Sequence, residues 1–106
     1  GMQTQKTVFA HPDLFAWAGI LSGGLTIKNH EVDYSNILFD KDKFAQTFRM
    51  LFVACGKQDV LYKMTEEGVS TVLQHGVTPE LYLTDGYHDW TFWRHSIVKF
   101  LMKLFR

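Results

Sequence analysis

The most continuous apolar run in the chain is Met50–Cys55, and it ends in the turn-forming residues Gly56–Asp59. An uninterrupted apolar run of this length is typical of a strand that is buried on both faces. Such strands occur in parallel sheets that are covered by helices on each side. We therefore interpret Met50–Cys55 as the central strand of a parallel sheet, which restricts the chain to an α/β fold.

Two further strands are predicted, one before and one after this run. The apolar segment Phe15–Ser22 stops at two glycines, and we place a strand in it from Trp17. In Glu80–Thr84, which follows a proline, leucines alternate with Tyr82 and Thr84. This period of two is the pattern of a strand.

Helices are expected between and around these strands. The first predicted helix covers residues 3–10 and ends at His11-Pro12-Asp13, and the second runs from Asp42, its N-cap, to Phe48. The third runs from Leu61 to Leu73 and ends at His75 and Gly76. The fourth runs from Asp89 to the end of the chain. The stretch Leu25–Lys43 is polar and irregular, so we expect a long loop there.

Strands separated by helices imply right-handed crossovers and a parallel sheet with helices on both faces. With 106 residues, 46% of them hydrophobic, the chain is expected to form a single three-layer α/β domain over residues 1–106. A sheet of about three strands is small for this architecture and leaves two open edges. The chain is therefore expected to be part of something larger.

The composition argues against several classes of partner. Eleven basic and eleven acidic residues give a formal net charge of zero, so neither nucleic acid nor an anionic membrane is expected. No apolar run approaches the ~18 residues of a membrane span. Cys55 is the single cysteine, so no internal disulfide is expected, and the compartment stays open. We expect no cofactor. Gly1, ahead of Met2, is interpreted as a remnant of tag removal.

Two polar residues follow successive predicted strands. Asp59 stands just beyond the central strand, and His88 lies between the last strand and the final helix. Because adjacent parallel strands lie ~4.8 Å apart, their loops can bring a carboxylate and an imidazole into contact. Such a pair is the orienting half of a Ser-His-Asp triad, with His88 as the base. A histidine in a loop is more often merely solvated, but Gly86 and the neighbouring tryptophans favour a pocket.

Two segments of the chain resemble one known family. LFVACGKQD at Leu51–Asp59 and GYHDWTFWR at Gly86–Arg94 look like the carboxy-terminal half of the esterase D-like α/β-hydrolases, which include tributyrin, acetyl-xylan, feruloyl and enterochelin esterases. In that family a Gly-x-x-Asp turn carries the catalytic acid and a Gly-Gly-His-Asp-Trp-like turn carries the histidine. By this match the catalytic residues are Asp59 and His88. Tyr87 replaces the second glycine of the histidine turn.

The resemblance also implies where the nucleophile lies. Pro12–Phe15 and Ser22-Gly23 match a family stretch that follows the nucleophile elbow, so the serine and the oxyanion-hole loop fall upstream of the first residue. The chain is then a fragment, or a truncated relative completed by another chain, of a serine carboxylic-ester hydrolase, and is inactive alone. Its substrate would be a small-molecule or carbohydrate-linked ester, with Trp90 as a wall of the substrate pocket.

Other interpretations remain open on the residues alone. Cys55 could serve as a substitute nucleophile, although a cysteine within an apolar strand usually behaves as a small hydrophobic residue. Ser22 does not meet the Gly-x-Ser-x-Gly pattern, because Gly19 lies three residues before it. The five histidines share no metal-ligand spacing, so no metal site is expected. A non-catalytic interaction module derived from the hydrolase fold would equally account for a missing nucleophile.

An incomplete sheet carries an expectation about association. If the sheet of the parent fold continues beyond the strand at Trp17, the chain exposes that strand's unpaired amides. Two copies could then pair edge to edge about a two-fold axis and bury the neighbourhoods of Phe15, Trp17 and Ile20. We therefore expect a homodimer or a higher homo-oligomer that forms through the exposed sheet edge.

Overall fold

A computed structural model of the chain describes residues 2–11, 14–28 and 30–105. Gly1 and Pro12-Asp13 lie outside the described residues, and so do the interpretation of Gly1 as a tag remnant and part of the Pro12–Phe15 match. In chain order the elements are α1 (Met2–Ala10), β1 (Trp17–Leu21), α2 (Ser35–Leu38), α3 (Lys41–Thr47), β2 (Met50–Gly56), α4 (Tyr62–Gln74), β3 (Glu80–Thr84) and α5 (Trp90–Leu104).

The described strands form one parallel sheet in the order β1-β2-β3. Ala18 pairs with Leu51 on one side of β2, and Val53 pairs with Leu81 on the other side. β2 is therefore the central strand, as the apolar run predicted. The prediction of a small parallel sheet of about three strands is confirmed, and the three predicted strand segments lie where the sequence indicated.

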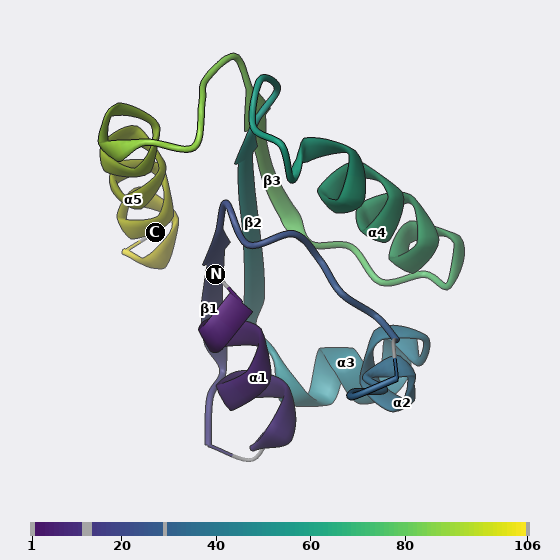
Figure 1. The fold of residues 1–106 in the computed structure, drawn as a ribbon. Helices are drawn as coiled ribbons and strands as arrows, with labels where there is room; N and C mark the ends of the chain where they lie inside the picture. Colours follow the sequence, from purple (N-terminus) through teal and green to yellow (C-terminus); the bar gives the residue numbers. More distant parts are fainter. Residues whose placement is uncertain (1, 12–13, 29, 106) are drawn as a thin grey trace.

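Helices cover both faces of this sheet (Figure 1). On one face, Leu51 and Val53 pack with buried side chains of α1, α3 and α4. On the other face, Phe52 and Ala54 pack against α5 through Phe92. Alternate residues of β2 thus face two separate apolar layers, and both layers exclude water. This is why the strand is apolar throughout, and the predicted three-layer α/β arrangement is confirmed.

The expected long loop at Leu25–Lys43 is wrong in part. It contains the short helix α2, and the side chains of Leu25, Ile37 and Leu38 are buried in the core. Lys28 and Asp33 form an isolated antiparallel bridge within it. The segment therefore contributes apolar side chains to the core beneath α1 and α4, although its polar residues hide this in the sequence.

The predicted cap of the next helix is also wrong by two residues. Asp40, not Asp42, is the N-cap of α3, and its carboxylate accepts hydrogen bonds from the backbone N–H groups of Asp42 and Lys43 at 3.1 and 3.0 Å. The carboxylate of Asp42 lies in the first turn instead. The predicted end of α4 is confirmed, because Gly76 follows the helix in the left-handed region with φ of 82°.

Candidate functional site

Asp59 and His88 meet at the carboxyl edge of the sheet. Asp59 lies in the loop after β2 and His88 in the loop after β3, and both loops stand at the same end of the molecule (Figure 1). Nδ1 of His88 lies 2.8 Å from Oδ2 of Asp59. The structure therefore brings together the two residues that the sequence paired, at hydrogen-bond distance.

The carboxylate of Asp59 is held on both of its oxygens. Its side chain is fully buried, and Oδ1 accepts a hydrogen bond from the backbone N–H of Leu61 at 2.9 Å. Its own N–H donates to the carbonyl of Gly56 at 3.0 Å, which closes the turn at the end of β2. A buried carboxylate with one oxygen already bonded has a fixed orientation. The remaining oxygen therefore points at His88 as a fixed acceptor.

His88 is half exposed, with 47% of its side chain accessible to solvent. The ring meets the indole of Trp93 edge-on, with centroids 5.1 Å apart and planes at 86°. Because Nδ1 faces Asp59, the other ring nitrogen, Nε2, is the one that remains available to accept or donate a proton. The imidazole thus has one nitrogen fixed by a carboxylate and one face against an aromatic wall, which suits a general base.

The indole of Trp93 is itself fixed by Ser22, a contact that the sequence did not reveal. Nε1 of Trp93 donates to Oγ of Ser22 at 2.9 Å, across from β1 to α5. Ser22 is buried and has a positive φ of 52°. Its hydroxyl therefore helps to hold the aromatic wall behind His88, in keeping with the interpretation of Ser22 as a structural serine.

The two loops that carry Asp59 and His88 are joined to each other by backbone contacts. The N–H of Lys57 donates to the carbonyl of Thr84 at 2.8 Å, and the N–H of Gln58 donates to the carbonyl of Gly86 at 3.0 Å. A Cβ on Gly56 would collide with the carbonyl of Gly86. Gly56 is thus required by the close approach of the loops. The sequence reasoning missed Gln58, which also contacts the histidine loop through its side chain.

Trp90 lies at the start of α5 and is 77% exposed. It lines an open apolar groove together with Leu21, Trp93, Arg94 and Ile97. The rings of Trp90 and Trp93 meet edge-to-face with centroids 5.8 Å apart. Because Trp93 also contacts His88, the groove begins beside the imidazole. Trp90 is therefore linked to the imidazole through Trp93, whose ring contacts both of them.

Cys55 lies within β2 and is fully buried. Burial raises the pKa of its thiol above the ordinary value, so little thiolate forms near neutral pH. Among residues 2–11, 14–28 and 30–105, no three His, Cys, Asp or Glu side chains gather where they could hold a metal ion. None of the helices described here is long and apolar enough to span a bilayer.

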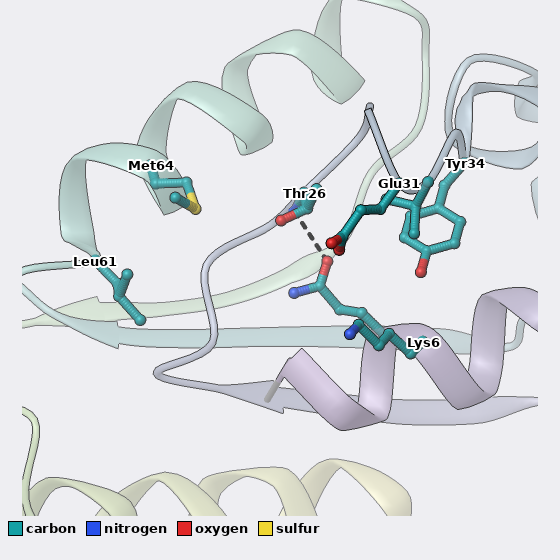
Figure 2. Close-up of a pocket in the computed structure, with 8 residues that line it drawn as sticks. Lys6, Thr26, Glu31, Tyr34, Leu61 and Met64 are labelled. Carbon is teal, nitrogen blue, oxygen red and sulfur yellow. Dashed lines mark hydrogen bonds between the residues drawn. The ribbon is translucent and has the colours of Figure 1, made fainter. Parts of the chain in front are cut away.

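A second hollow lies away from these residues, between α1, the segment before α2 and the start of α4 (Figure 2). It has a volume of about 180 Å³, and its lining includes Lys6, Glu31 and Met64. Gln5 at its base is buried and bonds the backbone of Gly24 and Thr26 at 2.6 and 2.9 Å. The lining contains no histidine or cysteine, so we take the pair Asp59 and His88 as the candidate site.

Comparison with known proteins supports the fold around this pair. No protein-family model matches the chain. The crystal structure of S-formylglutathione hydrolase from Staphylococcus aureus, in its apoenzyme form, matches 92% of this chain with a TM-score of 0.71 and 22% sequence identity. The chain has the fold of part of that hydrolase. It spans 48% of that neighbour's chain, and a likeness at this identity supports the fold alone.

Proposed function

We propose that this chain supplies the acid, Asp59, and the base, His88, of a Ser-His-Asp triad in a serine carboxylic-ester hydrolase. The observation that carries the proposal is the 2.8 Å contact between Nδ1 of His88 and Oδ2 of Asp59 at the carboxyl edge of a parallel sheet. The fold, which matches half of an esterase-like hydrolase, supports it. In such sheets the carboxyl edge is where substrates bind.

The contact between the two side chains supports a separate role for each residue. In this proposal the Nδ1–H of His88 donates a hydrogen bond to the carboxylate of Asp59, so the neutral imidazole has its lone pair on Nε2. Nε2 can then take the proton of a serine hydroxyl as its oxygen attacks the ester carbonyl. Asp59 stabilises the imidazolium, which afterwards returns the proton to the leaving alcohol, and water regenerates the serine by the same route.

The serine of this proposed triad comes from outside residues 1–106, either from a longer chain or from a partner. No serine in the described part of the chain has a recorded hydrogen bond to His88, and the hydroxyl of Ser22 accepts from Trp93 instead. The neighbour's chain is about twice as long as the matched region, which leaves room for a half that carries a nucleophile and an oxyanion hole. The isolated chain is therefore inactive in this proposal.

Trp90 serves this proposed site as a wall for the apolar part of the ester. The groove beside it is lined by apolar side chains together with the stem of Arg94 and adjoins the ring of Trp93. A flat aromatic surface next to a general base can bind an acyl or alcohol group by burying apolar area. Substrates to test are p-nitrophenyl acetate and an S-acyl thioester, since the neighbour is named for a thioester.

The first test uses the chain as it is. The rate of p-nitrophenyl acetate hydrolysis by the chain is compared with that of His88→Ala, and the two rates are expected to be equal. His95→Ala is the matched control, because His95 is an exposed histidine that lies within α5 rather than in the loop after β3. Turnover that disappears on replacing Cys55 or Ser22 would show that the nucleophile lies within this chain.

The second test concerns the reading frame upstream of Met2. An in-frame Gly-x-Ser-x-Gly shortly before Met2 is expected, and a longer protein that includes it is expected to hydrolyse esters. In that protein His88→Ala should lower kcat by about 10³-fold or more, because the base is lost, whereas His95→Ala should leave it unchanged. An active longer protein that tolerates His88→Ala would overturn the role of His88.

A non-catalytic interaction module is the second candidate function, and one observation favours it. Exposed apolar side chains near the end of α5, Leu101 and Met102, and Phe105 just after it, offer a contact surface beyond the groove beside His88. The absence of any upstream nucleophile pattern, together with a tight protein partner that binds this surface, would select the module over the enzyme.

A further inference from the structure

The side chain of Gln58 bridges the two loops of the candidate site. Gln58 stands immediately before Asp59, in the turn after β2. Its Oε1 accepts a hydrogen bond from the backbone N–H of Gly86 at 2.6 Å, and its Nε2 lies 3.4 Å from Oδ1 of Asp85. Its backbone N–H donates to the carbonyl of Gly86 at 3.0 Å. One residue therefore holds both the N–H and the carbonyl of Gly86.

Gly86 is the point at which the histidine loop is fixed. A Cβ on Gly86 would meet the ring of Phe92 at 2.5 Å, and its carbonyl lies against the Cα of Gly56. Gly86 is thus enclosed by α5 on one side and by the end of β2 on the other. His88 follows two residues later, so the position of Gly86 determines where the imidazole can reach.

The other end of the loop is fixed by α5. The carboxylate of Asp89 caps this helix by accepting from the N–H of Phe92 at 3.0 Å, and the N–H of Asp89 donates to the carbonyl of Tyr87 at 3.0 Å. Tyr87 and His88 therefore lie in a short segment that is fixed at one end by the contacts of Gln58 with Gly86 and at the other end by the helix cap at Asp89. If the contacts of Gln58 are lost, the loop keeps the helix cap, the bond to Asp59 and the contact with Trp93, but the N–H of Gly86 loses the acceptor that holds it to the turn after β2.

Gln58 and Asp59 also lie in the same turn. The contact of Gln58 with Gly86 and the contact of Asp59 with His88 are therefore held by one rigid segment. The carboxylate is locked to Leu61 and cannot follow a moving histidine. A displacement of the Gly86 peptide away from the turn after β2 breaks the bonds between Gln58 and Gly86. We propose that Gln58 is a positioning residue. Its hydrogen bonds to the N–H and the carbonyl of Gly86 fix the histidine loop and so keep the ring of His88 within reach of Asp59. This deepens the proposed function and rests on it for its relevance to catalysis.

The test compares Gln58→Ala and Gln58→Glu with the control Gln74→Ala, which removes an exposed glutamine at the end of α4. Two quantities are measured in the intact chain. The first is the hydrogen-exchange rate of the Gly86 amide. The second is the nitrogen-15 spectrum of the His88 ring, which reports what fraction of the neutral imidazole carries its proton on Nδ1. Neither quantity requires a nucleophile or a substrate.

In Gln58→Ala the Gly86 amide is expected to exchange about five- to tenfold faster, which is the effect of one lost hydrogen bond. The Nδ1-protonated fraction of His88 is expected to fall, because the ring no longer faces Asp59 in every molecule. Gln58→Glu retains an oxygen acceptor for Gly86 but sets a second carboxylate against Asp85, so it is made together with Asp85→Asn, and this pair should restore both readouts most of the way to those of the unaltered chain. Gln74→Ala should change neither.

Three results would overturn the proposal. If Gln58→Ala gives the same two readouts as Gln74→Ala, the side chain of Gln58 does not restrain the histidine loop. Faster exchange at Gly86 without a change at His88 shows a merely structural contact. Gln58→Glu with Asp85→Asn that behaves as Gln58→Ala shows that the oxygen facing the Gly86 N–H is not the atom that matters. Failure of the proposed function looks different, because an inactive longer protein would leave all of these readouts as expected.

Discussion

At the scale of single residues, the buried carboxylate of Asp59 is the most constrained group of the candidate site. It is hydrogen-bonded to the N–H of Leu61 and to Nδ1 of His88, and its side chain has no access to solvent. In Asp59→Asn, one side-chain oxygen remains to satisfy the N–H of Leu61, and the amide nitrogen that replaces Oδ2 can only donate. His88 must then present an unprotonated Nδ1, so its proton moves to Nε2, where it could no longer accept from a nucleophile.

We therefore expect Asp59→Asn to switch the neutral tautomer of His88, as read from the nitrogen-15 spectrum of the ring. The free energy of unfolding in urea should fall by about 1–3 kcal/mol, since a charge-assisted bond in a buried site is replaced by a weaker one. Glu67→Gln, at an exposed carboxylate on α4 away from the candidate site, is the control. An unchanged tautomer would mean that the contact at 2.8 Å does not orient the imidazole.

Cys55 allows a second test at this scale. Because burial raises the pKa of its thiol, the thiolate that would react is scarce in the folded chain at neutral pH. As the pH rises toward the raised pKa, the thiolate fraction grows, but the side chain remains fully buried. We expect iodoacetamide to label the native chain far more slowly than the chain unfolded in guanidinium. Rapid labelling of the native chain at neutral pH would contradict this and revive Cys55 as a nucleophile candidate.

The sequence predicted the two polar residues that meet but not the contacts that hold them. Asp59 and His88 follow strands whose positions are set by apolar patterns, and parallel strand ends share one edge of a sheet. Gln58 and Ser22 gave no such signal, because their roles depend on loop conformation and on side-chain direction. The loop torsions that aim Gln58 at Gly86 are fixed only when Gly56, Gly86 and Phe92 are packed together.

At the scale of elements, the strands could be predicted because each is a run of apolar residues that fits one period. The segment before α3 could not, since Ile37 and Leu38 stand among polar residues and a helix of four residues has no period to detect. Its burial follows from the layer above the sheet, where α1, α3 and α4 leave room for these side chains. Tertiary packing rather than local preference decides such a segment.

The cap of α3 gives a prediction that separates two neighbouring aspartates. Asp40 accepts from two backbone N–H groups, whereas Asp42 lies in the first turn, where it interacts only with the helix dipole. Asp40→Ala should lower the free energy of unfolding by about 0.5–2 kcal/mol. Asp42→Ala should lower it less, by about 0.3–1 kcal/mol, because only a dipole interaction is lost.

Urea denaturation of the two variants measures this difference. Each variant removes one negative charge, so the change in net charge is the same in both. The effect reaches the whole fold because Phe44 of α3 and Phe48 at its end are buried in the core. A larger loss for Asp42→Ala than for Asp40→Ala would contradict the observed cap and favour the one that the sequence indicated.

At the scale of the whole molecule, apolar side chains gather around one edge of the sheet. β1 pairs only with β2 among the described strands, and Phe15 and Trp17 are 37% and 47% exposed beside it. α5 packs against β1 and carries exposed Ile97 and Leu101. Ile20 does not belong to this surface, because it is buried in the chain's own core. The expected interface is therefore corrected to the strand edge, Phe15, Trp17 and the neighbouring side of α5.

An open strand edge beside apolar side chains favours association, since it offers unpaired backbone groups and apolar area together. We propose that, in the absence of a further half of the fold, two copies pair through β1 about a two-fold axis. A stable interface of this kind buries about 1,200–2,000 Å² in total. We expect light scattering to give a dimer at micromolar concentration, with dissociation on dilution.

Variants can locate this interface. Trp17→Lys and Leu101→Lys each place a charge within the proposed contact surface, and in a symmetric dimer each charge meets its own copy or an apolar neighbour. Both variants should be monomeric. Val60→Lys is the matched control, because Val60 is 90% exposed in the turn after β2, away from β1, and its replacement should leave the dimer intact. A monomeric unaltered chain would show instead that the edge of β1 stays unpaired in solution. A dimer that survives both lysine variants would place the contact elsewhere on the molecule.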